Sequence, residues 1–159
     1  MPKLSGLIHI FNHESHLGRA LESLRQCDEV VVINHGAREE ILKVARDHGA
    51  RIVNGVNGVD HGAYVQDAHH DWILCLRSDE AVAEELEASL LEWKQSEKVD
   101  DQLGYNIGIR AQNGTTWKSL APEMRLANRQ RINWTTDCPP TAPNAPALPG
   151  YIARIPDQE

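Results

Sequence analysis

Short apolar runs alternate with amphipathic stretches four times in the first half of the chain. The clearest run is DEVVVIN at residues 28–34, where three valines and an isoleucine follow one another. A strand buried on both faces, as in a parallel sheet, has such an uninterrupted run. Other strands are predicted at 4–11, 50–54 and 72–76, and helices at 12–26, 38–48, 63–70 and 81–98. This order predicts an α/β fold: a mainly parallel sheet flanked by helices, with right-handed crossovers.

The second half of the chain has a different pattern. Apolar stretches at residues 103–111, 123–128 and 130–136 predict strands, and Asn113-Gly114 predicts a turn between two of them. Five of the eight prolines fall between Pro139 and Pro149. Because proline lacks a backbone N–H, this segment predicts an irregular loop, followed by one edge strand at residues 151–155. The expectation is a small C-terminal β region.

Length and charge narrow the classes of protein. A chain of 159 residues predicts one domain, and a net charge of −7 argues against nucleic acid or an anionic membrane as a partner. No apolar stretch is long enough to span a bilayer, and the opening MPKLSG does not resemble a signal peptide. The three cysteines share no paired spacing, which suits reduced thiols. Together these features predict a soluble cytoplasmic protein.

Polar residues follow three of the predicted parallel strands. They lie at Phe11-Asn12, at Asn34-His35-Gly36 and at Arg77-Ser78-Asp79-Glu80. In parallel α/β sheets, ligands bind beside the carboxyl ends of the strands. We therefore expect these three segments to form one site.

The segments around those strand ends resemble a known family. LSGLIHIFNHESHLGRALESL, DEVVVINHG, KVARDHGARIV and DWILCLRSDEAVAEEL are similar in order and spacing to bacterial family 2 glycosyltransferases, in particular to the subgroup that adds sugars to lipopolysaccharide cores. The resemblance covers residues 4–95 and continues more weakly through RLANRQRINW and LPGYIARI. It implies a Rossmann-like GT-A domain, with a nucleotide-binding half at 1–98 and an acceptor-side half at 99–159. It also implies transfer of a sugar from a nucleoside-diphosphate sugar, with uridine as the expected nucleoside, to a hydroxyl acceptor in cell-surface glycan synthesis.

The resemblance assigns nucleotide contacts to the first two strand ends. Phe11, Asn12 and Glu14 stand where the family has a turn that touches the nucleotide. Asn34 stands where the family has an aspartate that accepts a hydrogen bond from the uracil ring, and Gly36 follows it. The asparagine can still accept and donate hydrogen bonds, but it cannot offer the charge-assisted bond of a carboxylate.

At the fourth strand the family has Asp-Ala-Asp-Glu, and this chain has Arg77-Ser78-Asp79-Glu80. Asp79 matches the aspartate that binds a divalent cation, which would be Mg²⁺ or Mn²⁺ because these ions prefer oxygen ligands. Arg77 replaces an aspartate on the nucleotide side, and its guanidinium could contact the diphosphate, repel the cation or form a salt bridge. An inverting transferase also needs a general base, for which Asp137 and Glu80 are the candidates.

Other readings of these residues stay open. The changes at 34 and 77, together with the absence of the family's acidic pair after Trp134, could mean a glycosyltransferase fold that has lost catalysis and serves in binding or assembly. Asp79 and Glu80 could simply favour a helix N-terminus, and Asn34 could be a turn residue. A third hypothesis is a zinc site, because imidazole suits zinc and several histidines fall near the strand ends, namely His9, His13, His16, His35 and His61.

Overall fold

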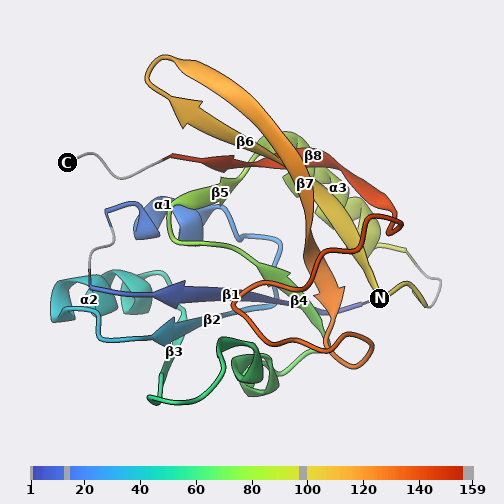
Figure 1. Ribbon diagram of the computed structural model, residues 1–159. Helices are drawn as coiled ribbons and strands as arrows, with labels where there is room; N and C mark the ends of the chain where they lie inside the picture. Colours follow the sequence, from blue (N-terminus) through green and yellow to red (C-terminus); the bar gives the residue numbers. More distant parts are fainter. Residues whose placement is uncertain (1, 13–14, 97–99, 156–159) are drawn as a thin grey trace.

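A computed structural model of the chain describes residues 2–12, 15–96 and 100–155. Its centre is one curled sheet of eight strands in the order β3-β2-β1-β4-β7-β6-β8-β5, flanked by helices (Figure 1). Four strands from the first half are parallel neighbours: β1 (Leu4–Ile10), β2 (Glu29–Asn34), β3 (Arg51–Asn54) and β4 (Trp72–Cys75). The predicted α/β fold with its parallel, helix-flanked portion is therefore confirmed.

The apolar runs are buried on both faces of the parallel portion, as their uninterrupted pattern predicts. Ile8 and Val32 belong to a core cluster on one face, which also contains side chains of α1 (Leu17–Glu22), α2 (Glu39–Asp47) and α3 (Glu84–Lys94). Leu7 and Val31 belong to the cluster on the other face. That face is covered by the 3₁₀ helix η1 (His61–Asp67) and by the loop that carries Trp134 and Cys138.

The sheet continues into the second half of the chain without a break. Strand β7 (Thr116–Asn128) lies antiparallel to β4, and it forms a long hairpin with β6 (Gly104–Asn113). The hairpin turns at Gly114, whose φ of 64° is in the left-handed region, and its tip extends away from the helices (Figure 1). Strands β8 (Ala147–Arg154) and β5 (Glu80–Val82) complete the sheet. The predicted β-rich half thus shares one sheet with the α/β half.

The helix predicted at residues 81–98 is wrong at its start. Residues Glu80–Val82 form β5, which pairs with β8, and α3 begins only at Glu84. Glu80 therefore lies in a strand, not at a helix N-terminus. The local apolar spacing fits a helix, but pairing with a distant strand overrides it.

Two other boundaries also differ from the predictions. Residues 130–136 are not a strand, since the chain leaves the sheet after Asn128. At that point the guanidinium of Arg129 donates to the carbonyl oxygens of Val65 and Ala68. The predicted Pro-rich loop at 139–149 ends earlier than expected, since β8 begins at Ala147 and lies inside the sheet, not at its edge. A register shift between Ile107 and Gly108 of β6 accommodates the proline at 149, which has no N–H to donate.

The first helix is shorter than predicted. It spans Leu17–Glu22, and the residue at its N-cap is His16, not Asn12. None of the helices in the described part of the chain is long and apolar enough to cross a membrane.

Candidate functional site

The carboxyl ends of β1 and β2 lie side by side, as predicted. Ile10 pairs with Asn34 in the parallel register, so the residues that follow each strand share one edge of the sheet. Phe11 stacks on His35 with ring centroids 5.0 Å apart, and it is 47% exposed. The predicted residues Phe11 and Gly36 therefore frame this edge, with Asn12 exposed beside them. Glu14 lies outside the described residues.

Asn34 uses its amide to order the turn that follows β2. Its Oδ1 accepts hydrogen bonds from the backbone N–H of Gly36 (3.2 Å) and of Ala37 (2.8 Å), and its Nδ2 donates to Asn54 (3.1 Å). Gly36 has a φ of 96°, which favours glycine because it has no side chain to clash. The turn-residue reading of Asn34 thus describes its contacts, and a ligand would meet an amide already fixed in place.

Asp79 is half-buried among arginines. Arg19 donates to its backbone carbonyl oxygen at 3.4 Å. Burial, followed by the negative charge of Glu80, raises the pKa of the Asp79 carboxyl, while the charges of Arg154 and Arg77 oppose that rise. A carboxylate whose pKa is raised lacks full compensation for its charge, so it gains from a cation placed beside it.

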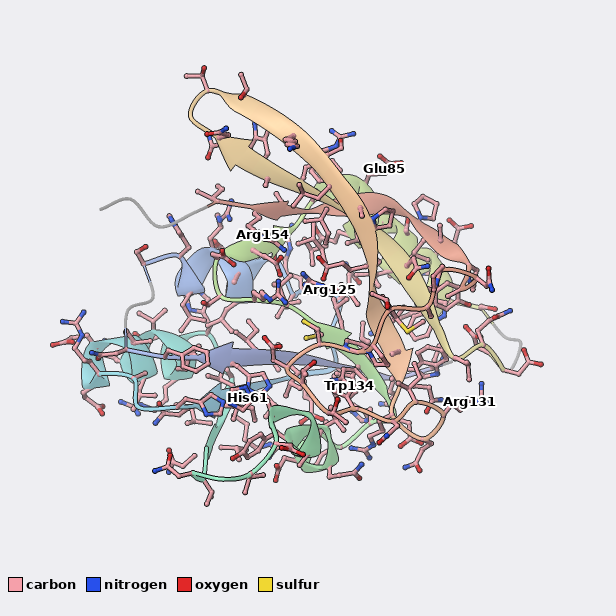
Figure 2. The ribbon with its side chains drawn as sticks, in the orientation of Figure 1. His61, Glu85, Arg125, Arg131, Trp134 and Arg154 are labelled. Atoms are coloured by element: carbon pink, nitrogen blue, oxygen red, sulfur yellow. The ribbon has the colours of Figure 1, made fainter. Side chains whose placement is uncertain are left out.

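Glu80 is fully buried and bound by two arginines. Arg125, also 0% exposed, donates to both carboxylate oxygens at 2.7 and 2.9 Å, and Arg154 donates to one of them at 2.9 and 3.1 Å. Burial works against ionisation of Glu80, but the hydrogen bond and charge of Arg125 outweigh it and lower the pKa to about 2. Figure 2 labels both arginines beside one another above β1. The expectation that Glu80 acts on an acceptor is not met, because its carboxylate is enclosed and its oxygens are already bonded.

Arg125 is the charged residue that sequence reasoning missed. It sits in β7 among apolar residues, in the segment EMRLAN, where alternation gives no hint that an arginine points inward. It also donates to the carbonyl oxygen of Cys75 at the end of β4. The Arg125–Glu80 pair therefore ties β7 to the segment that carries Asp79.

Asp137 is brought to the same edge by a loop that crosses the sheet. Its carboxylate lies 3.7 Å from the guanidinium of Arg77, and its side chain is 35% exposed. The thiol of Cys75 donates to its backbone carbonyl oxygen at 2.7 Å, and Cys75 contacts Cys138 at 3.2 Å. The salt-bridge reading of Arg77 is thus realised with Asp137, and the two residues lie together although 60 positions separate them in the sequence.

Three of the five histidines near the strand ends come together. His9, His35 and His61 offer ring nitrogens that all lie within 4.8 Å of one another. His13 lies outside the described residues, and His16 lies at the start of α1.

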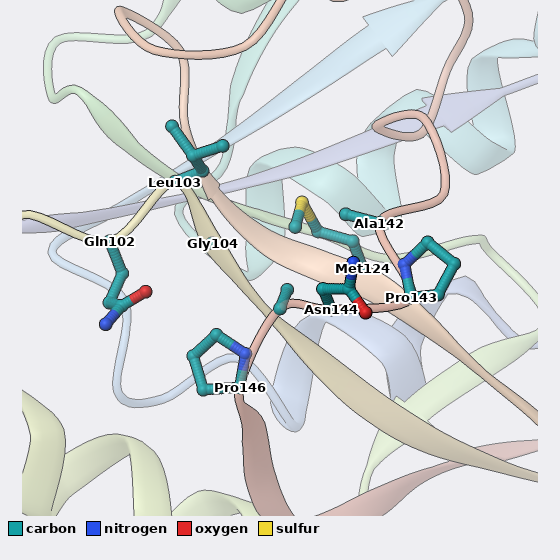
Figure 3. A pocket seen from close by; sticks show the side chains of 9 residues that line it. Gln102, Leu103, Gly104, Met124, Ala142, Pro143, Asn144 and Pro146 are labelled. Carbon is teal, nitrogen blue, oxygen red and sulfur yellow. The ribbon is translucent and has the colours of Figure 1, made fainter.

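A separate pocket of about 280 Å³ lies in the second half of the chain (Figure 3). Its walls are residues 102–104, Met124 and residues 142–146. None of the residues predicted for the site lines it, so it is distinct from the edge formed by β1, β2 and β4.

The sequence was compared with family models and with known proteins. No family model matches the chain. It is 26% identical over 113 residues to an uncharacterized glycosyltransferase of Rickettsia typhi, and 27% identical over 126 residues to one of Rickettsia bellii. These matches cover 69% and 76% of this chain but only 39% and 43% of the relatives, so the chain spans about two-fifths of their length.

Solved structures agree with the relatives. Glucosyl-3-phosphoglycerate synthase from Mycobacterium tuberculosis, in complex with Mn²⁺, uridine-diphosphate-glucose and phosphoglyceric acid, superposes with a TM-score of 0.52 and 15% identity. The superposition covers 71% of this chain and 45% of the synthase. The chain has a glycosyltransferase fold. At this identity the likeness concerns the fold alone, and the roles of individual residues rest on the geometry described above.

Proposed function

We propose that the chain binds a nucleoside-diphosphate sugar at the carboxyl edge of β1, β2 and β4 and transfers the sugar to a hydroxyl acceptor. One observation carries the proposal: this edge gathers an exposed aromatic ring, a carboxylate and several guanidinium groups in a glycosyltransferase fold. Phe11 offers the ring, Asp79 the carboxylate, and Arg77 lies near both Asp79 and Asp137. Such a set suits a base, a diphosphate and a sugar in one ligand.

The nucleotide would lie across the first two strand ends. Phe11 would pack on the base, with Asn12 and Asn34 beside it, and Gly36 leaves room because no atom lies within 4 Å of the place of a Cβ there. Glu14 remains a candidate contact from the sequence. The uridine type is the nucleotide we expect, since the structurally similar synthase is described with uridine-diphosphate-glucose.

Asp79 would hold Mg²⁺ or Mn²⁺. A half-buried carboxylate with a raised pKa fits such an ion, which proteins often bind through one or two carboxylates together with substrate phosphates. The bound ion would neutralise charge on the departing diphosphate. Arg77 would add a second positive group on the diphosphate side.

The transfer would proceed at the anomeric carbon of the sugar. The acceptor oxygen forms a bond to that carbon, the bond to the diphosphate oxygen breaks, and the nucleoside diphosphate leaves. Asp137 would take the proton of the acceptor hydroxyl, since its carboxylate is partly exposed at the same edge. The lipopolysaccharide-core resemblance favours an acceptor in cell-surface glycan synthesis.

Binding of uridine-diphosphate-glucose tests the proposal directly. We expect saturable binding by calorimetry that strengthens with Mn²⁺, and a loss of at least about tenfold in affinity for Asp79→Ala, since even indirect partners of a metal contribute that much. Asp47→Ala is the matched control, because its only described ion pair is an exposed one with Lys43. No binding of any nucleotide sugar, or equal binding by both variants, would contradict the proposal.

A second candidate is a domain that binds without catalysing transfer. Two observations favour it. Arg77 forms an ion pair with Asp137, the candidate general base. The side-chain amide of Asn34 already forms hydrogen bonds within its own turn. In this case the domain would serve as a binding or assembly partner.

Restoring two acidic residues separates the candidates. If the site has lost its acids, as the second candidate holds, the double variant Arg77→Asp, Asn34→Asp is expected to gain about tenfold in Mn²⁺-dependent affinity for uridine diphosphate, because a second carboxylate joins Asp79 and a charge-assisted bond becomes possible. Under the leading proposal the same variant is expected to lose affinity, because the guanidinium of Arg77 no longer contacts the diphosphate. Calorimetry measures the gain, and Arg38→Asp, at an exposed arginine, is the control. Nucleoside diphosphate release from the wild-type protein would exclude the binding-only candidate, and an unchanged affinity of the double variant would show that its acids cannot reach the nucleotide.

A further inference from the structure

Three imidazoles from three different elements meet at one place. His9 lies on β1, His35 follows β2, and His61 begins η1. The Nδ1 of His9 lies 2.8 Å from the Nε2 of His35, and the ring centroid of His61 is 4.3 Å from that of His35 and 5.0 Å from that of His9. Figure 2 labels His61 below β1. Chain folding, rather than local sequence, therefore brings the three rings together.

The buried member of this group has an unmet hydrogen-bonding capacity. His9 is 6% exposed, and within the described part of the chain its Nε2 is buried without a hydrogen-bond partner. A buried polar nitrogen left unpaired is unfavourable, because folding has removed its hydrogen bond to water. A metal ion is a partner that would fill this place, because imidazole binds metals through the lone pair of a ring nitrogen.

The surroundings hold the rings in place. A Cβ on Gly55 would lie 2.6 Å from the Nδ1 of His35. Any residue larger than glycine at position 55 would therefore push the His35 ring out of its position. Phe11 stacks on His35 from the outside, and Tyr64 meets His9 and His35 edge-on. Walls that fix several ligands in advance are what a metal site requires.

The spacing of the nitrogens fits a tetrahedral ion. Zinc bound to imidazole at ~2.0–2.1 Å separates neighbouring ligand nitrogens by about 3.4 Å. That separation lies within the 4.8 Å limit of the whole group. Small ring rotations, which break the hydrogen bond between the two histidines, would bring the three nitrogens onto one ion.

We propose that His9, His35 and His61 bind a zinc ion. Imidazole ligands suit zinc, whereas Mg²⁺ and Mn²⁺ prefer oxygen ligands such as the carboxylate of Asp79. Three protein ligands leave a fourth position for water or another group. Asp137 lies near the group, because its negative charge acts on both His9 and His35. The zinc site is separate from the proposed cation at Asp79 and does not depend on nucleotide binding.

Metal titration of untagged, chelator-treated protein tests the site. We expect Co²⁺ to produce the visible absorption bands of a tetrahedral site, and Zn²⁺ to displace it with one ion per chain by elemental analysis. His61→Gln and His35→Gln, at rings that are only half-buried, are each expected to lower zinc affinity at least about tenfold. His48→Gln is the matched control, because His48 is exposed at the end of α2 and does not belong to the histidine group.

The variants also separate this site from the nucleotide site. Asp79→Ala is expected to bind zinc as the wild-type protein does, whatever its affinity for nucleotide sugar. Circular dichroism of each variant establishes that it is folded, and Gly55→Ala, which displaces His35 without removing a ligand, should weaken zinc binding as well. Absence of tetrahedral Co²⁺ bands, or equal zinc affinity in the wild-type, His35→Gln and His61→Gln proteins, would overturn the proposal.

Discussion

Replacing Glu80 with glutamine is expected to destabilise the protein by about 3 kcal/mol, at the low end of the cost of breaking a buried ion pair, because Arg125 keeps Glu123 as a second carboxylate partner at its Nε. Arg125 is 0% exposed, and both of its terminal nitrogens donate to Glu80. Arg154 loses the same partner. Glutamine has nearly the same shape, so the loss reports charge rather than packing.

The measurement is the free energy of unfolding from urea denaturation at pH 7. Glu87→Gln is the matched control, because Glu87 also binds an arginine through two hydrogen bonds, but at the surface. Exposed ion pairs contribute little, so the control should unfold as the wild-type protein does. A Glu80→Gln variant as stable as this control would show that the buried pair contributes nothing beyond its hydrogen bonds.

The same pair predicts how stability depends on pH. The pKa of Glu80 is about 2 in the folded protein, below the ordinary glutamate value of about 4.3. A group whose pKa is lowered by folding stabilises the folded state fully above its unfolded pKa and loses that contribution as the pH falls toward its folded pKa. The urea concentration at the midpoint of wild-type unfolding should therefore decrease as the pH is lowered from ~5 to ~2. Over the same interval, the difference in midpoint between the wild-type protein and Glu80→Gln should become smaller. A constant difference would contradict the assignment of the charge to Glu80.

The parallel half of the fold could be predicted because its signals are local. A strand buried on both faces must be apolar throughout, and DEVVVIN has that property at β2. The edge that carries Phe11, Gly36 and Asp79 then follows from the order of strands and helices. No knowledge of distant contacts is needed for this step.

The rest of the fold and of the candidate site depends on contacts between residues that are far apart in the sequence. Glu80 looked like the first turn of a helix, yet it is a strand residue bound by Arg154, 74 positions later. Likewise, histidines near strand ends could be recognised in the sequence, but nothing local shows that His61 reaches His9. Its position depends on how η1 packs under the loop at 134–138, which is a tertiary property.

That packing rests on Gly62. A Cβ at this position would lie 2.2 Å from the carbonyl oxygen of Trp134 and 2.5 Å from the backbone nitrogen of Thr135. Neither atom belongs to a flexible side chain, so the backbone itself must move. Gly62→Ala is expected to destabilise the protein by about 1–3 kcal/mol, as overpacking of a well-packed interior does. Gly108→Ala is the matched control, because its Cβ would meet atoms only at 3.4 Å and beyond.

The displaced backbone also carries the site, so the variant should show a second effect. Moving the loop away from η1 separates Asp137 from Arg77 and uncovers Cys138, which is 8% exposed, and Cys75, which is 1% exposed. A thiol reagent should therefore modify these cysteines faster in Gly62→Ala than in Gly108→Ala under native conditions. Peptide mapping of the modified protein identifies the residues. If unfolding alone explained the reactivity, Cys27 would be modified in step with them. Selective modification of Cys75 and Cys138 would instead show that Gly62 holds the loop at 134–138 in its place over these two cysteines.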